Sequence, residues 1–216
     1  IRQPGPDTEW NLHCTAHTYD PSIIRCLVKT KSLDFPLYKE LNAKSNFMIP
    51  FKDITLADKD TITSFTMKSD RRNCDLSFSN LCSWRFLYDT QFAVVDNFLV
   101  FKFWAGEQLA YMMPVGTGDL KAVLWELIED ARKENQHFCM LGVCSNMRAD
   151  LEAILPEQFT FTEDRDYADY IYLRSDLSTL KGKKFQAKRN HINRFRNTYP
   201  DYEYTPITPD RIQEFA

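Results

Sequence analysis

The chain has 216 residues and a formal net charge of -3, and its hydrophobic and aromatic fractions are 44% and 14%. This length and composition allow one substantial buried core, which excludes a disordered chain. No stretch approaches the roughly 20 consecutive apolar residues that a membrane-spanning helix requires, and no signal peptide opens the chain. The cytoplasm is therefore the expected compartment.

The cysteines and histidines follow no metal-binding or disulfide pattern. The 6 cysteines include no CxxC pair and lack the spacing of a small secreted scaffold. His13, Cys14 and His17 lie close together, but no second pair of ligands follows at a zinc-like distance. We expect reduced thiols and no bound metal.

Residues 1–47 differ in pattern from the rest of the chain. Pro4, Pro6, Pro21 and Pro36 interrupt them, and neither a helical nor a strand period persists. A regular pattern begins at Met48. We therefore expect residues 1–47 to be an irregular or non-native extension, and the first domain to cover residues 48–175.

From residue 48 onward, hydrophobic periodicity predicts alternating helices and strands. The expected elements, in chain order, are helices at 57–67 and 77–88, strands at 92–96, 98–104 and 108–113, a helix at 120–131, a strand at 138–143, a helix at 147–155, and strands at 159–162 and 167–173. Asp119 is the predicted N-cap of the helix at 120–131. The first three strands form an antiparallel meander, so the fold class is α+β, with a mixed, mostly antiparallel sheet flanked by helices.

The segment 181–196 reverses the sign of the charge. It carries seven Lys or Arg residues and no Asp or Glu, so residues 176–216 have a net charge of +3 whereas residues 48–175 have -7. In a helix, Phe185, Ile192, Phe195 and Tyr199 share one face, which predicts a docked helix with a cationic outer surface. Such a surface concentrates polyanions: a phosphorylated small molecule, an RNA or an anionic lipid surface. The alternative is a solvated helix that keeps the protein soluble.

The order of elements, a meander that leads into a glycine loop and then a long helix, resembles the N-acetyltransferase (GNAT-like) fold. Three stretches are similar to the signature of the phosphatidylglycerol lysyltransferase C-terminal domain family: 169–172 (DYIY), 180–184 (LKGKK) and 188–195 (KRNHINRF). Further residues fit the same family pattern, namely Phe78, Asn80, Trp84, Arg85 and the turn at 114–116.

The resemblance implies two GNAT-like halves in tandem, of which residues 176–216 would be the truncated start of the second. It also implies a transferase that moves an aminoacyl group from aminoacyl-tRNA to an acceptor, which is a membrane lipid in the best-understood members. No cofactor is expected beyond this donor, and coenzyme A is the alternative donor. An anionic lipid surface is a second expected partner, and the inner face of the membrane a second expected location.

The aminoacyl ester is already activated, so its transfer requires positioning, a proton acceptor and donors that face the oxyanion. Lys181, Lys183, Lys184, Lys188 and Arg189 are the candidates for holding the phosphodiester backbone of the donor. The candidate catalytic residues are Asp169, Asn190 and His191. Asp169 fits an ion pair with Lys188 or Arg189 better than a general base, and His191 fits an ordinary surface residue.

The loop 116–119 (GTGD) lies where acyl-CoA enzymes of this fold bind pyrophosphate. Met113 stands where a coenzyme A loop usually presents Arg or Gln, and Asp119 adds negative charge, so helix capping is the better explanation. The aromatic residues Phe78, Trp84, Phe86 and Tyr88 fit either a core or an acyl pocket. Two alternative functions remain: an acetyl-CoA-dependent N-acetyltransferase, and a non-catalytic module that binds RNA or anionic lipid through its basic helix.

Overall fold

The computed structural model describes residues 26–30, 48–69, 71, 73–163 and 172–214. The chain divides into two compact units: the larger unit spans residues 20–169, and the smaller unit includes residues 170–216. Within the described part of the chain, no helix has the length and apolarity needed to span a membrane.

One 8-stranded sheet runs through the larger unit in the order β2-β3-β4-β5-β7-β1-β8, with β6 paired to β4. Its strands are β1 (Cys26–Thr30), β2 (Lys52–Asp53), β3 (Gln91–Val95), β4 (Phe98–Ala105), β5 (Gln108–Tyr111), β6 (Val115–Gly116), β7 (Cys139–Val143) and β8 (Phe159–Glu163). All pairings are antiparallel except that of β5 with β7, which meet in parallel where Tyr111 lies opposite Met140. This mixed, mostly antiparallel sheet confirms the predicted α+β, GNAT-like fold class.

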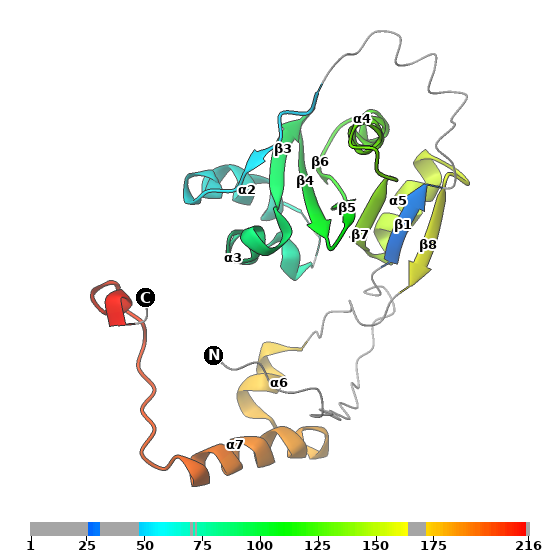
Figure 1. The fold of residues 1–216 in the computed structure, drawn as a ribbon. Helices are drawn as coiled ribbons and strands as arrows, with labels where there is room; N and C mark the ends of the chain where they lie inside the picture. The colour runs from blue at the N-terminus through cyan, green and yellow to red at the C-terminus, as the bar shows by residue number, and fades with distance from the viewer. Residues whose placement is uncertain (1–25, 31–47, 70, 72, 164–171, 215–216) are drawn as a thin grey trace. The chain divides into compact units, whose positions relative to one another are not determined.

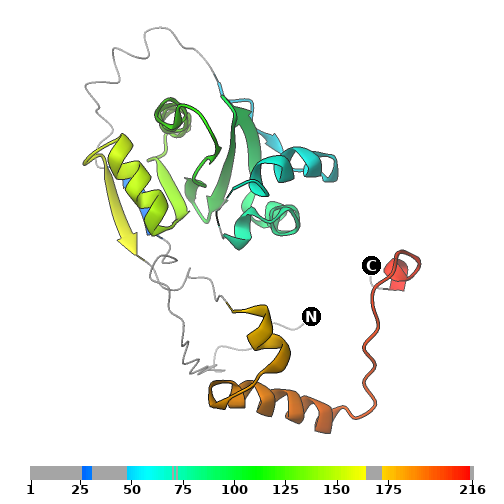
Figure 2. The same ribbon diagram turned by 180° about the vertical axis from the view of Figure 1, so that it is seen from behind.

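Helices cover both faces of the sheet (Figures 1 and 2). The larger unit contains α2 (Lys59–Thr66), α3 (Phe78–Tyr88), α4 (Leu120–Lys133) and α5 (Ser145–Ile154), together with the short 3₁₀ helices η2 (Leu56–Asp58) and η3 (Cys74–Leu76). On one face, α4 and α5 bury a core that includes Val123, Leu127 and Leu151. On the other face, α2 and α3 contribute Ile62 and Leu81 to a second core. The sheet is therefore a shared wall between two apolar layers.

The long helix α4 forms as its sequence predicts. The side chain of Asp119 accepts a hydrogen bond from the backbone N–H of Ala122 at 3.1 Å, which satisfies one of the free donors of the first turn. Its buried residues include Leu124 and Ile128, which belong to the predicted apolar face.

Tyr111 is the largest side chain that is fully buried in the core. Its ring stacks on Phe138 with centroids 5.4 Å apart, and its hydroxyl donates to Asp130 of α4 at 2.7 Å. Lys102 of β4 lies 3.3 Å from the same carboxylate. Burial first, and then the charge of Asp130, raises the pKa of Tyr111, so the hydroxyl stays protonated and fixes α4 on the sheet.

The prediction of irregular structure over residues 1–47 is wrong for Cys26–Thr30. These five residues form β1, which pairs with β7 on one side and with β8 on the other. The segment is short, and Val28 is its one fully buried side chain among those described, so the alternation is too brief to stand out in the sequence. The remainder of 1–47, with His13, Cys14 and His17, lies outside the described residues.

The predicted strand at 167–173 falls mostly outside the described residues as well. Tyr172 and Leu173 are described, and they precede a helix rather than form a strand. The smaller unit contains α6 (Arg174–Thr179), the 3₁₀ helix η5 (Lys183–Phe185), α7 (Gln186–Thr198) and the 3₁₀ helix η6 (Pro209–Glu214).

The apolar face predicted for the basic helix is buried only at its start. Phe185 is 5% exposed, whereas Ile192, Phe195 and Tyr199 are 38%, 48% and 58% exposed. Within the smaller unit, the predicted apolar face is thus covered only at Phe185. The exposed rings contact each other instead: Phe195 lies 5.2 Å from Tyr199 and 5.1 Å from Tyr202 between ring centroids.

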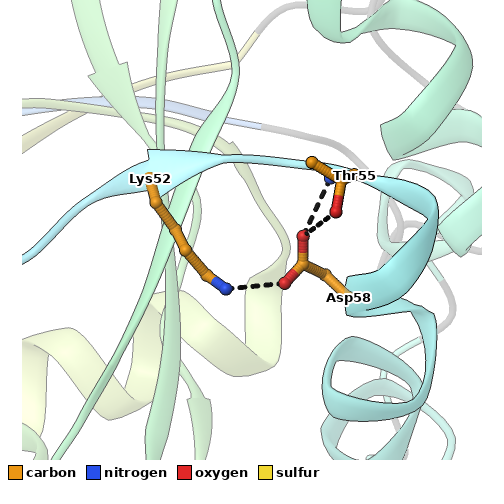
Figure 3. Close-up of polar contacts among 3 residues, drawn as sticks. All are labelled: Lys52, Thr55 and Asp58. Carbon is orange, nitrogen blue, oxygen red and sulfur yellow. Dashed lines mark hydrogen bonds and ion pairs between the residues drawn. The ribbon is translucent and has the colours of Figure 1, made fainter.

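A small polar cluster joins β2 to the helices that follow (Figure 3). Asp58 accepts hydrogen bonds from the Lys52 ammonium group at 2.6 Å, from the Thr55 hydroxyl at 2.6 Å and from the Thr55 backbone N–H at 2.9 Å. The hydrogen bond from Lys52, followed by those from Thr55, lowers the pKa of Asp58 from 3.8 to about 2. The carboxylate of Asp58 therefore has a structural role, because its hydrogen bonds hold the turn between β2 and α2.

We predict that Asp58→Ala lowers the free energy of unfolding by about 1 kcal/mol at neutral pH, because the turn loses its acceptor. Because folding lowers the pKa of Asp58, its contribution to stability is fully present above pH 3.8. The difference in the free energy of unfolding between the wild type and the variant therefore shrinks as the pH falls from 3.8 to about 2. Urea unfolding measures both effects, with the exposed Asp60→Ala as the matched control. A difference that is constant across this pH range would contradict the assignment.

Candidate functional site

The predicted phosphate-binding residues lie between the end of α6 and the first turns of α7. The Lys184 ammonium group is 3.0 Å from the carboxylate of Asp176, which lies in α6. The Lys188 ammonium group is 5.0 Å from the centroid of the Tyr172 ring. The absence of acids from 181–196 therefore does not leave every cation uncompensated, because Asp176 lies just outside that window.

Arg189 has a structural task. Its guanidinium donates hydrogen bonds to the carbonyl oxygens of Leu180 and Gly182, the latter at 2.8 Å. Leu180 caps the C-terminus of α6 in the left-handed conformation, with φ 46°, so its carbonyl lies beyond the regular helical hydrogen bonds. Arg189 thus ties the first turns of α7 to the end of α6.

Four of the seven cations in 181–196 are free to meet a ligand. Lys181, Lys183, Arg194 and Arg196 are exposed, and none forms an ion pair with a carboxylate of the residues that the structure describes. Lys184 and Arg189 hold α6 to α7. Lys181 and Lys183 precede these two cations in the sequence, and Arg194 and Arg196 follow them. These four exposed cations are the part of the predicted cationic set for which the structure shows no other task.

The three candidate catalytic residues are not brought together by the described structure. Asn190 and His191 are neighbours on α7, and both are exposed. Asp169 lies outside the described residues, so its pairing with Lys188 or Arg189 stays a prediction.

A cavity of about 470 Å³ opens in the larger unit between α3 and the sheet. It is lined by Asn73, Asp75, Asn80, Leu81, Trp84, Tyr88, Thr90, Phe103, Ala105, Gly106, Met112, Leu141 and Gly142. Three rings follow one another along its wall: Trp84 and Tyr88 have centroids 6.4 Å apart, and Tyr88 meets Phe103 edge-on at 6.5 Å. Its volume is in the range of small-molecule sites.

The aromatic residues of α3 divide between the two roles that the sequence left open. Phe78 packs against the core on the α2 and α3 side, as expected for a structural residue. Trp84 and Tyr88, one helical turn apart, line the cavity. Phe86 does neither: it is 76% exposed, with the Arg85 guanidinium 3.9 Å from the centroid of its ring.

Sequence reasoning missed Asp75 and Phe103 as residues of a site. Asp75 lies in η3, a three-residue 3₁₀ helix that has too little periodicity to be predicted. Phe103 belongs to a strand in which most side chains are apolar, and nothing local distinguishes a ring that lines a cavity from one that fills a core. Both residues line the same cavity, although they are far apart in the sequence.

The glycine loop before α4 is shaped by packing. Gly116 pairs with Phe98 of β4, and a Cβ atom on it would collide with the backbone carbonyl oxygen of Asn97. Gly118 has φ 143° and lies against the backbone of Asp96. Asp119 places its carboxylate on the first turn of α4, at the position that a pyrophosphate would need.

We predict that Arg189→Ala loosens the smaller unit, whereas Lys183→Ala does not. Loss of a charged donor that serves two carbonyls costs about 1 kcal/mol in local opening, or roughly fivefold faster hydrogen exchange of the α6 amides. Hydrogen exchange followed by mass spectrometry measures this rate. Equal exchange in both variants would show that the contacts of Arg189 hold nothing in place.

Known proteins resemble the chain in sequence and in structure. The chain matches the family described as phosphatidylglycerol lysyltransferase, C-terminal, over residues 66–216. It is similar to the crystal structure of a conserved protein of unknown function from Bacteroides thetaiotaomicron VPI-5482, with a TM-score of 0.70 and 90% identity over 78% of this chain and 57% of that chain. This chain thus spans little more than half the length of that protein. No curated protein matches it. Because the family match covers well over half of its residues, the chain belongs to the phosphatidylglycerol lysyltransferase C-terminal family.

Proposed function

We propose that the chain is part of an aminoacyltransferase that takes its aminoacyl group from a charged tRNA. The observation that carries the proposal is the exposed set Lys181, Lys183, Arg194 and Arg196, which lies within and on both sides of the stretch 188–195 of the family match. An RNA backbone needs several such cations along one surface, since each neutralised phosphate adds to the affinity. The larger unit is acidic overall, so this surface is where a polyanion would be attracted.

The reaction would need little from the protein beyond positioning. The acceptor oxygen attacks the carbonyl carbon of the aminoacyl ester, a new ester bond forms, and the bond to the ribose oxygen of the tRNA breaks. The proton of the acceptor hydroxyl goes to a base, and the released ribose oxygen takes up a proton. Asp169 and His191 are the proposed candidates for the base, and Asn190 the candidate donor to the oxyanion. The acceptor is a lipid hydroxyl or another acceptor of the same kind.

Three observations count against acetyl-CoA as the donor. The turn at Gly116 is explained by its close approach to Asn97, and Asp119 occupies the first turn of α4. In addition, none of the described residues that line the cavity is basic. A phosphate-rich donor therefore fits the basic segment better than the fold's usual coenzyme site.

We predict that replacing Lys181 and Lys183 together by Ala weakens the binding of deacylated tRNA and lowers the slope of log affinity against log salt by roughly one per lysine. The double variant Lys59→Ala with Lys121→Ala is the matched control, because it removes the same charge from exposed positions of the larger unit. Fluorescence anisotropy at several salt concentrations measures the affinities.

An unchanged slope in the Lys181 and Lys183 variant would remove the basic segment from the donor site. Anionic phosphatidylglycerol vesicles and coenzyme A serve as parallel ligands. Binding of vesicles without binding of tRNA would favour the lipid-binding module, and binding of coenzyme A alone would favour the acetyltransferase.

A further inference from the structure

We propose that the cavity beside α3 binds a small, neutral aromatic molecule that carries one amide-like polar group. This inference goes beyond the proposed function and does not rest on it, because every residue that carries it belongs to the larger unit. Two features of the cavity lining carry it: a wall of aromatic rings, and uncharged polar side chains that are available for hydrogen bonds.

One face of α3 lines the cavity over two helical turns. Asn80, Trp84 and Tyr88 follow one another at four-residue intervals, so they share this face, and all three line the cavity. The helix rises by roughly 12 Å from the first of them to the last. The face is polar at Asn80 and aromatic at the two residues that follow. A ligand that lies along it is therefore matched by a polar group at one end and an aromatic body.

The aromatic wall favours a flat ring over an alkyl group. The ring centroids of Trp84 and Tyr88 are 6.4 Å apart, and Tyr88 meets Phe103 of β4 edge-on at 6.5 Å. Phe103 is 9% exposed, whereas Trp84 and Tyr88 are 52% and 39% exposed and keep ring surface that a ligand can cover. Aromatic rings attract one another beyond what their buried area explains. A ligand ring would therefore extend a series of rings that the fold already provides.

The polar group of the ligand is matched by Asn80. Its backbone N–H donates to the Ser77 hydroxyl at 3.3 Å, but its side-chain amide makes no hydrogen bond to any residue that the structure describes. The hydroxyl of Thr90, which also lines the cavity, makes none to the described residues either, although Thr90 is only 7% exposed. A side-chain amide both donates and accepts, so its best partner is a group with the same two capacities.

These polar groups suit a ligand without a charge. A charged group that leaves water for a cavity needs a compensating partner, and uncharged side chains such as Asn80 and Thr90 return less than its desolvation costs. Asp75 also lines the cavity, but it already interacts within the protein, where the Cys74 thiol lies 3.7 Å from its carboxylate. We therefore assign Asp75 no part in the choice of ligand.

NMR titration of the chain with phenylacetamide and two analogues of nearly the same shape tests the proposal. Cyclohexylacetamide keeps the amide but has a saturated ring. Phenylacetone keeps the aromatic ring but has a methyl group in place of the amide nitrogen, so it cannot donate. Phenylacetamide is expected to bind at least about threefold more tightly than either analogue.

Two variants assign these preferences to side chains. Trp84→Leu should at least halve the preference for phenylacetamide over cyclohexylacetamide. Phe86→Leu is the matched control, because Phe86 is an exposed ring of the same helix that does not line the cavity. Asn80→Leu should abolish the preference over phenylacetone, with Asn197→Leu, at an exposed position of α7, as its control.

The proposal would be overturned if phenylacetamide did not bind, if the three probes bound equally, or if neither preference changed in its variant. Tighter binding of phenethylammonium or phenylacetate would overturn it as well, because the site would then select a charge. Tighter binding of hexanamide would replace it by a pocket for an alkyl chain. If a variant does not fold, the comparison of probes on the wild type still decides. Failure of tRNA to bind leaves this test unaffected, since tRNA takes no part in it.

Discussion

The hydrogen bond from Tyr111 to Asp130 is the constraint on which the larger unit depends. It joins β5 to α4 at the residue where β5 meets β7, the one parallel pairing in the described sheet. Two parallel neighbours need a crossover connection, and α4 supplies it. Because Asp130 also faces Lys102, the buried hydroxyl, the carboxylate and the ammonium group satisfy one another inside the core. The cavity beside α3 is lined on the sheet side by Phe103 of β4 and by Leu141 and Gly142 of β7.

The proposed RNA-binding surface follows from a separation of charge along the chain. Residues 48–175 carry a net charge of -7, whereas residues 176–216 carry +3. Lys184 and Arg189 use part of that positive charge to hold α6 to α7. The exposed cations that remain would attract a polyanion to the smaller unit.

The sequence predicted the structure and the family correctly where a long hydrophobic periodicity or a family pattern was present. The apolar face of α4 and its cap at Asp119 were predictable, as were the meander and the family, because each depends on neighbours in sequence. The position of β1 was not, since five residues become a strand only through partners that lie far along the chain. The cavity was hidden for the same reason: no local pattern links Asp75 to the rings of α3 and β4 that line it. The partial exposure of α7 shows that an amphipathic pattern predicts which side chains share an apolar face, but not which segment covers that face.

Hydrogen–deuterium exchange of the chain with and without deacylated tRNA tests whether the basic segment binds RNA, because it locates the contact without any substitution. We expect slower exchange over residues 181–196 and unchanged exchange over α4. Slower exchange confined to the larger unit, or no change anywhere in 181–196, would contradict it.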